Sequence, residues 1–116
     1  MGRKTLCIDF DGVIHSYTSG WQGATIISDP PVAGAFDWLD TLIDEYEVCI
    51  YSSRSKDVGG IEAMRDWFVA YAYDPQDLEF PTEKPAAHLT IDDRAICFRG
   101  TFPSILEIEH FKPWYK

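Results

Sequence analysis

The sequence predicts an α/β domain built around a central parallel β-sheet. Three observations indicate this class: short apolar runs recur along the chain, segments with helical periodicity separate them, and several of the runs end in polar residues. At 116 residues the chain has the length of one domain, and its hydrophobic fraction of 46% is typical of globular proteins. We therefore expect residues 1–116 to form a single domain with one core.

The first half of the chain contains two expected strands and one expected helix. Residues 4–10 form an apolar run that predicts a buried strand. Residues 13–28 contain two short apolar stretches around a glycine-containing turn, which predicts a small hairpin flap after the first strand. Apolar residues at helical spacing predict a helix over residues 33–45, and residues 47–53 predict the second strand.

The second half of the chain continues the alternation. A helical pattern runs from Ile61 to Tyr71, and short strands are expected at 77–80 and 88–91, while residues 95–98 allow one more. The segment 104–107, Ser-Ile-Leu-Glu, has the spacing of a capping box and predicts a last short helix. Alternating strands and helices favour a Rossmann-like, three-layer domain with helices on both faces of the sheet.

The composition excludes several classes of function. The net charge of −9 repels nucleic acid, so sequence-independent binding of DNA or RNA is not expected. No apolar run approaches the roughly 18 residues of a membrane span, and the N-terminal segment is too weakly apolar for a signal peptide. The three cysteines, Cys7, Cys49 and Cys97, are widely spaced within apolar runs. We expect them to be reduced core residues of a cytoplasmic protein.

Polar residues follow several of the predicted strands. They are Asp9, Asp11 and Gly12 after the first strand, Ser52, Ser53 and Arg54 after the second, Asp92 and Asp93 after the strand 88–91, and Lys84 in the loop before that strand. Ligands of open parallel sheets bind beyond the carboxyl ends of the strands, so we expect one rim to collect these side chains. Four carboxylates in one place repel one another, and a hard divalent cation such as Mg²⁺ resolves that repulsion.

Four motifs in these segments resemble those of the haloacid dehalogenase superfamily. They are "DFDGV", "IYSS", "EKP" and "TIDD", they occur in the family's order, and they lie within residues 5–93. The resemblance implies that Asp9 is a nucleophile that forms an aspartyl-phosphate. It also implies that Asp11 protonates the leaving oxygen and then deprotonates the hydrolytic water. The chain leaves the strand at Gly12, which allows Asp11 to turn toward the leaving group.

The same resemblance implies the remaining roles. Mg²⁺ would be held by Asp9, by the backbone carbonyl of Asp11 and by a carboxylate of the Asp92–Asp93 pair. Lys84 is similar in place to the lysine that steadies the phospho-aspartate, and Ser52 to the hydroxyl that binds a phosphoryl oxygen. Because side chains alternate along a strand, only one of Ser52 and Ser53 is expected to point inward, with Ser52 preferred.

Several other residues have two interpretations. Arg54 either binds substrate or pairs with an acidic neighbour, and Asp93 either holds the metal through water or pairs with Lys84. His15 is expected at the surface. Trp21 belongs to the core, to a lid or to a stacking surface. The other three tryptophans, Trp38, Trp67 and Trp114, are expected to be core or packing residues.

The predicted function is that of a capless, Mg²⁺-dependent phosphatase. The segments from Gly12 to Phe36 and from Arg54 to Lys84 are too short for a cap domain, which predicts an open site. Nucleotides or other small phosphomonoesters are the expected substrates. A polynucleotide 3′-phosphatase is the first alternative, because "SSR" at residues 52–54 loosely resembles end-healing enzymes, although the acidic charge disfavours it. A non-catalytic domain that binds phosphate or a protein is the second alternative.

Overall fold

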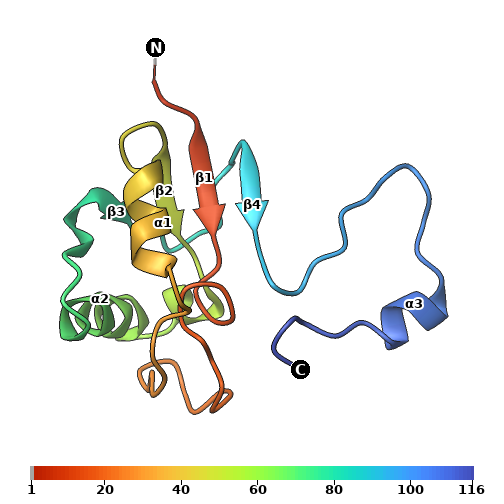
Figure 1. The fold of residues 1–116 in the computed structure, drawn as a ribbon, viewed down its shortest axis with the longest axis horizontal. Helices are drawn as coiled ribbons and strands as arrows, with labels where there is room; N and C mark the ends of the chain where they lie inside the picture. The colour runs from red at the N-terminus through yellow and green to blue at the C-terminus, as the bar shows by residue number, and fades with distance from the viewer. Residues whose placement is uncertain (1) are drawn as a thin grey trace.

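A computed structural model of the chain describes residues 2–116 (Figure 1). The elements in order are β1 (Thr5–Ile8), α1 (Ala35–Leu42), β2 (Glu47–Ile50), the 3₁₀ turn η1 (Ser53–Lys56), α2 (Gly60–Ala70), the 3₁₀ turn η2 (Pro75–Asp77), β3 (Leu78–Glu79), β4 (Leu89–Ile91) and α3 (Ile105–Glu109). All strand pairs are parallel, and the sheet order is β3-β2-β1-β4. The predicted α/β class is confirmed, and so is the position of the first strand between β2 and β4.

One apolar cluster lies against the sheet. Alternate residues of a strand point to the same face, and Leu6 and Ile8 of β1 enter the cluster together with Val48 and Ile50 of β2. Both longer helices bury side chains in it. From α1 these are Ala35 and Leu39, and from α2 they are Met64, Trp67 and Phe68. The helical periodicity of these two segments therefore predicted their buried faces correctly.

The opposite face of the sheet carries Cys7 and Cys49, which are both buried. The segment 81–88, which connects β3 to β4, is extended and places Lys84 near Cys7. Two prolines in this segment oppose a helix there, since proline cannot donate the backbone hydrogen bond and clashes with the preceding turn. The expected helical layer on this face is thus replaced by an extended segment.

The segment 13–28 forms turns, and the predicted hairpin strands are absent from it. His15 makes only isolated bridges, with Asp11 and with Pro31. Side chains bind the backbone in place of a strand ladder. Asp29, for example, accepts 2.7 Å and 2.6 Å hydrogen bonds from the backbone N–H and the hydroxyl of Ser19. The prediction was wrong because such bonds satisfy the polar backbone without strand pairing.

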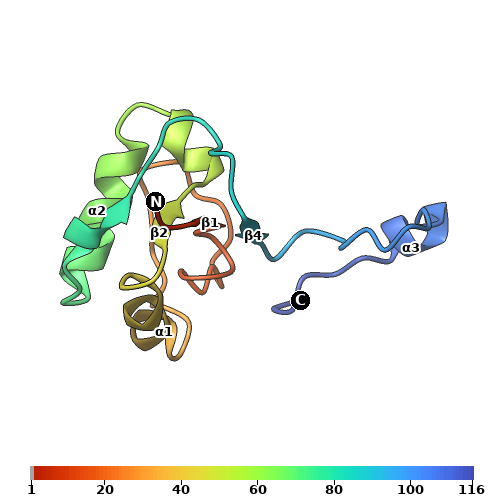
Figure 2. The same ribbon diagram turned by 90° about the horizontal axis from the view of Figure 1, so that it is seen from above.

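Residues 94–110 form an arm that extends away from the sheet and carries α3 (Figures 1 and 2). The strand allowed at 95–98 is absent, and Cys97 is exposed, so the core prediction holds only for the other two cysteines. The chain turns away from the sheet after β4, so no sheet surface is left to cover these residues. Ser104 does cap α3, since its hydroxyl accepts a 3.1 Å bond from the Glu107 N–H. Within the described residues, no helix combines the length and apolar character that a bilayer crossing requires.

Candidate functional site

Three carboxylates meet where β1 and β4 end. The two strands run in register, with Ile8 opposite Ile91, and the backbone N–H of Asp9 donates a 2.9 Å bond to the carbonyl of Ile91. The residues that follow the strands therefore emerge side by side. Carboxylate oxygens of Asp9, Asp92 and Asp93 all lie within 4.8 Å of one another. We call these three residues the carboxylate group, and its formation agrees with the proximity of Asp9 and Asp92 expected from the sequence.

Crowding of the carboxylate group changes its protonation. Burial raises the pKa of Asp9 to about 9, and the hydrogen bond with Asp93 and the charges of Asp92 and Asp93 act in the same direction. Partial burial also acts to raise the pKa of Asp93, but hydrogen bonds from Asp9 and Tyr115 outweigh it, so the pKa is lowered. Without a cation, burial and the neighbouring carboxylates thus favour the protonated form of Asp9. A divalent cation that prefers oxygen ligands can replace that proton.

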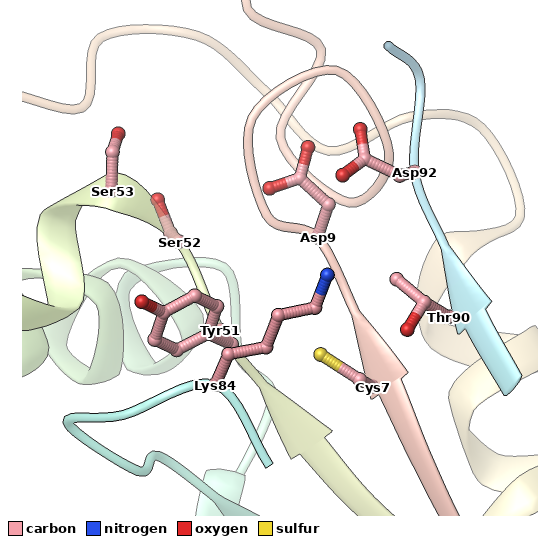
Figure 3. Close-up of a pocket in the computed structure, with 8 residues that line it drawn as sticks. All are labelled: Cys7, Asp9, Tyr51, Ser52, Ser53, Lys84, Thr90 and Asp92. Carbon is pink, nitrogen blue, oxygen red and sulfur yellow. The ribbon is translucent and has the colours of Figure 1, made fainter. Parts of the chain in front are cut away.

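Asp9 also lines a cavity of about 140 Å³ (Figure 3). The other lining residues include Lys84, Asp92, Ser52 and Ser53. Lys84 enters from the segment 81–88, and its amino group points toward Asp9. Ser52 and Ser53 both line this cavity, and the inward position of the Ser52 hydroxyl stays a prediction. The 3₁₀ turn η1 begins at Ser53, where the alternation of the strand ends.

The Ser52 hydroxyl is held in place by the turn that follows it. It accepts a 3.1 Å bond from the backbone N–H of Arg54, and the backbone N–H of Ser52 donates a 3.0 Å bond to the Ser55 hydroxyl. Because the Ser52 oxygen is used as an acceptor, its proton remains for donation to an oxygen in the cavity.

Arg54 is completely buried and pairs with Asp11. Its Nε donates to the Asp11 carboxylate at 2.9 Å and one terminal nitrogen donates to it at 3.1 Å. The other terminal nitrogen donates to the carbonyls of Gly23, Ala24 and Ile26 at 2.8–3.2 Å. Of the two interpretations, pairing with an acidic neighbour is the one observed, and the assignment of Arg54 to direct substrate binding is corrected accordingly.

His15 is buried, so its expected surface position is wrong. Its ring stacks on Phe10, with 5.4 Å between the ring centroids, which makes it part of the core. The backbone N–H of Asp29 donates to His15 Nε2 at 3.1 Å, so Nε2 is an acceptor and the proton lies on Nδ1. His15 Nδ1 then donates to Asp11 at 2.9 Å.

The Asp11 side chain stands apart from the carboxylate group because Arg54 and His15 hold it. The expected cluster of four carboxylates therefore contains three. Asp11 nevertheless lines, together with Asp9, an adjoining cavity of about 270 Å³. This position keeps its carboxylate available to groups bound next to Asp9.

Two residues near the other end of the sequence complete the site. The indole N–H of Trp114 donates to the Gly12 carbonyl at 2.7 Å, across 102 positions of sequence, and the Tyr115 hydroxyl donates to Asp93 at 2.8 Å. Asp93 therefore pairs with Tyr115, which was not among the expected partners. Trp114 is 64% exposed, so of the two expected roles, core and packing, the core role is wrong, whereas its ring does pack edge to face on Tyr115. No motif surrounds either aromatic residue, and only the tertiary structure brings them to the site.

Comparison of the chain with protein-family models, with curated proteins and with solved structures finds no match. Function is therefore inferred from the motifs and from the geometry of the carboxylate group and its cavities.

Gly12 should tolerate no side chain. Its φ is +83°, and an added methyl group would overlap the Asp93 carboxylate and come within 2.8 Å of the Tyr115 ring. Gly20 is a matched control, with φ of +72° and nothing within 4 Å of such a methyl group. Both alanine substitutions should lower the free energy of unfolding by about 1–2 kcal/mol through left-handed backbone strain. Gly12→Ala should lose roughly 1–3 kcal/mol more through overpacking, measured by urea unfolding. Equal losses would contradict this packing.

The raised pKa of Asp9 predicts how stability depends on pH when a chelator is present. The folded-state pKa is about 9, above the ordinary value of 3.8, so the unfolded chain loses this proton first as pH rises. The stabilisation is complete below about pH 4 and is lost progressively toward pH 9. Asp9→Asn should flatten the pH profile of the unfolding free energy over this range. The exposed Asp44→Asn should leave the profile unchanged, and a flat wild-type profile would refute the assignment.

Proposed function

We propose that this chain is a Mg²⁺-dependent phosphomonoester hydrolase of the haloacid dehalogenase type, with Asp9 as its nucleophile. The observation that carries the proposal is the meeting of Asp9 and Asp92, two members of the carboxylate group, with Ser52, Ser53 and Lys84 around one cavity. The motifs that contribute these residues have the order of that superfamily. The parallel sheet, with the site beyond the carboxyl ends of β1, β2 and β4, supports a Rossmann-like interpretation.

The donor set fits a magnesium ion. Asp9, Asp92 and Asp93 supply hard oxygen ligands, and their carboxylate oxygens lie within 4.8 Å of one another, close enough to share one ion. When bound, the ion supplies the positive charge that lets an anionic nucleophile approach a phosphate dianion.

The protein's own residues then divide the reaction between them. The Asp9 carboxylate attacks phosphorus, an oxygen–phosphorus bond forms, and the bond from phosphorus to the leaving oxygen breaks. Asp11 gives a proton to the leaving oxygen, and later takes one from the water that cleaves the aspartyl-phosphate and releases phosphate. Lys84 and the Ser52 hydroxyl bind oxygens of the transferred group and offset its charge.

The hydrogen bonds of Asp11 orient its carboxylate and leave one position open for proton transfer. Its Oδ1 accepts from His15 and Arg54, whereas Oδ2 accepts only from Arg54 Nε. A lone pair of Oδ2 therefore remains for the transferred proton. The same bonds fix the orientation of the carboxylate, which shortens the search for a reactive geometry.

Substitution of the two aspartates should separate their roles. Asp9→Asn should abolish Mg²⁺-dependent hydrolysis of p-nitrophenyl phosphate, because an amide cannot act as the nucleophile. Asp11→Asn should release one equivalent of nitrophenol in a burst and then turn over at least 100-fold more slowly, since hydrolysis of the aspartyl-phosphate lacks its base. Stopped-flow absorbance measures both phases. Full steady-state activity of either variant would rule out its assigned role.

A stability control belongs with this experiment. Asp11→Asn leaves Arg54 buried without its counter-charge, which costs about 3–5 kcal/mol. The kinetics are therefore measured well below the melting temperature of the variant, with its folded fraction checked by circular dichroism. Asp44→Asn, on the exposed surface, serves as the reference for an aspartate outside the site.

Magnesium should stabilise the folded protein through the carboxylate group. At about 100 times the dissociation constant the gain is roughly 2.7 kcal/mol, which raises the melting temperature by about 10 °C for a domain of this size. Ca²⁺ should give a similar shift but little turnover, because its looser coordination misplaces the phosphoryl group.

Thermal melts with chelator, Mg²⁺ and Ca²⁺ test this expectation. Asp92→Asn should lose most of the shift and Asp44→Asn should keep it. If millimolar Mg²⁺ leaves the melting temperature of the wild type unchanged, or shifts that of Asp92→Asn equally, the carboxylate group is not the metal site.

A further inference from the structure

A second and larger cavity, of about 510 Å³, adjoins the site. Tyr17, Arg94 and Tyr115 line both this cavity and the 270 Å³ cavity that contains Asp9 and Asp11. We call the larger one the outer cavity. A phosphoryl group at Asp9 would direct its leaving group past these three shared residues, so the outer cavity lies where a leaving group can extend.

The walls of the outer cavity are rich in aromatic rings. Tyr17 and Tyr115 meet edge to face, with 6.2 Å between their ring centroids, and Trp21 is 49% exposed beside them. An exposed indole ring such as that of Trp21 offers a surface on which planar rings stack. Of the three interpretations of Trp21, namely core, lid and stacking surface, its position therefore favours the stacking surface.

The outer cavity is also locally basic, in a chain of net charge −9. Arg94 and Lys116 line it, and none of its lining residues is acidic. Two cations in the lining attract an anionic group, and arginine binds phosphate through two parallel hydrogen bonds. The outer cavity thus offers a ring surface and an anion site next to the proposed phosphoryl site.

The polar wall of the outer cavity is held in place before any ligand binds. Asp29 binds the backbone and hydroxyl of Ser19, which lines the cavity, and Arg54 binds the carbonyls of residues 23, 24 and 26, which follow the lining segment 17–21 in the chain. The Arg54 guanidinium also lies 4.8 Å from the centre of the Trp21 ring. A preformed wall reduces the ordering that binding has to overcome.

We propose that the outer cavity selects phosphomonoesters whose leaving group carries an aromatic ring and a second anionic group. Nucleotides with a second phosphate have this chemistry. It occurs in free nucleoside 3′,5′-bisphosphates and in the 3′-phosphorylated end of an oligonucleotide, where the neighbouring phosphodiester is the second anion. The inference rests on the proposed function, because it requires the reacting phosphate to lie at Asp9.

Steady-state kinetics on four substrates tests the selection. They are a nucleoside 3′,5′-bisphosphate, a 3′-phosphorylated dinucleotide, p-nitrophenyl phosphate and glycerol phosphate. An aromatic ring and a second anionic group in the substrate should each raise kcat/KM about tenfold. The kcat/KM of one of the two nucleotide substrates should therefore exceed that of glycerol phosphate by about 100-fold. The better of the two identifies the source of the ligand. Equal kcat/KM for all four substrates would overturn the inference.

Matched variants assign the selection to the outer cavity. Arg94→Gln should lower kcat/KM for the preferred nucleotide about tenfold more than for glycerol phosphate, whereas Arg99→Gln, on the exposed arm, should change neither. Trp21→Leu should reduce the advantage of ring-bearing substrates, and the exposed Phe102→Leu should not. Equal effects of Arg94→Gln and Arg99→Gln would contradict the anion site.

A binding measurement separates this inference from the proposed function. Calorimetric titration of Asp9→Asn with the nucleoside bisphosphate, in the presence of Mg²⁺, reports the outer cavity without turnover. Affinity that falls about tenfold in Asp9→Asn/Arg94→Gln supports the cavity even if no phosphomonoester is hydrolysed. The opposite result is also possible: p-nitrophenyl phosphate is hydrolysed only when Asp9 is present, but the affinity for the nucleotide is the same with and without Arg94. That result would overturn the inference and leave the proposed function standing.

Discussion

The buried ion pair between Arg54 and Asp11 joins the parts of the chain that form the site. Arg54 has no exposed surface, so loss of either partner would leave a charge inside the protein without compensation. The pair links the residues after β1 to those after β2, and the same guanidinium holds the backbone of residues 23–26. One side chain therefore links the residues after β1, the turn after β2 and the loop that follows the lining segment 17–21 of the outer cavity.

His15 extends this network into the apolar core. Its neutral ring lies between the Asp11 carboxylate and the backbone N–H of Asp29, and it stacks on Phe10. The Trp67 indole N–H donates to the Asp29 carbonyl at 2.9 Å, which ties the same loop to α2. Core residues thus contact the polar groups of the candidate site, and these groups are held by packing as well as by hydrogen bonds.

Charge is distributed unevenly across the two adjoining cavities. Burial and the neighbouring carboxylates raise the pKa of Asp9 in the carboxylate group, whereas the residues that line the outer cavity include Arg94 and Lys116 and no acidic residue. Tyr115 stands at the boundary, since its hydroxyl donates to Asp93 and its ring faces Tyr17. A cation is attracted on one side of this boundary and an anion on the other, as a phosphorylated ligand with a bound metal would require.

The sequence alone determined the α/β class, the two longer helices and the proximity of Asp9 to Asp92. Periodicity is a local property, and adjacent parallel strands bring their carboxyl ends to one edge whatever the side chains that follow. Only the tertiary structure decided that Arg54 and His15 are buried, that the loop after β1 forms turns, and that Trp114 reaches Gly12. Each of these depends on which polar groups find partners, often across tens of residues, and short sequence patterns do not encode such pairings.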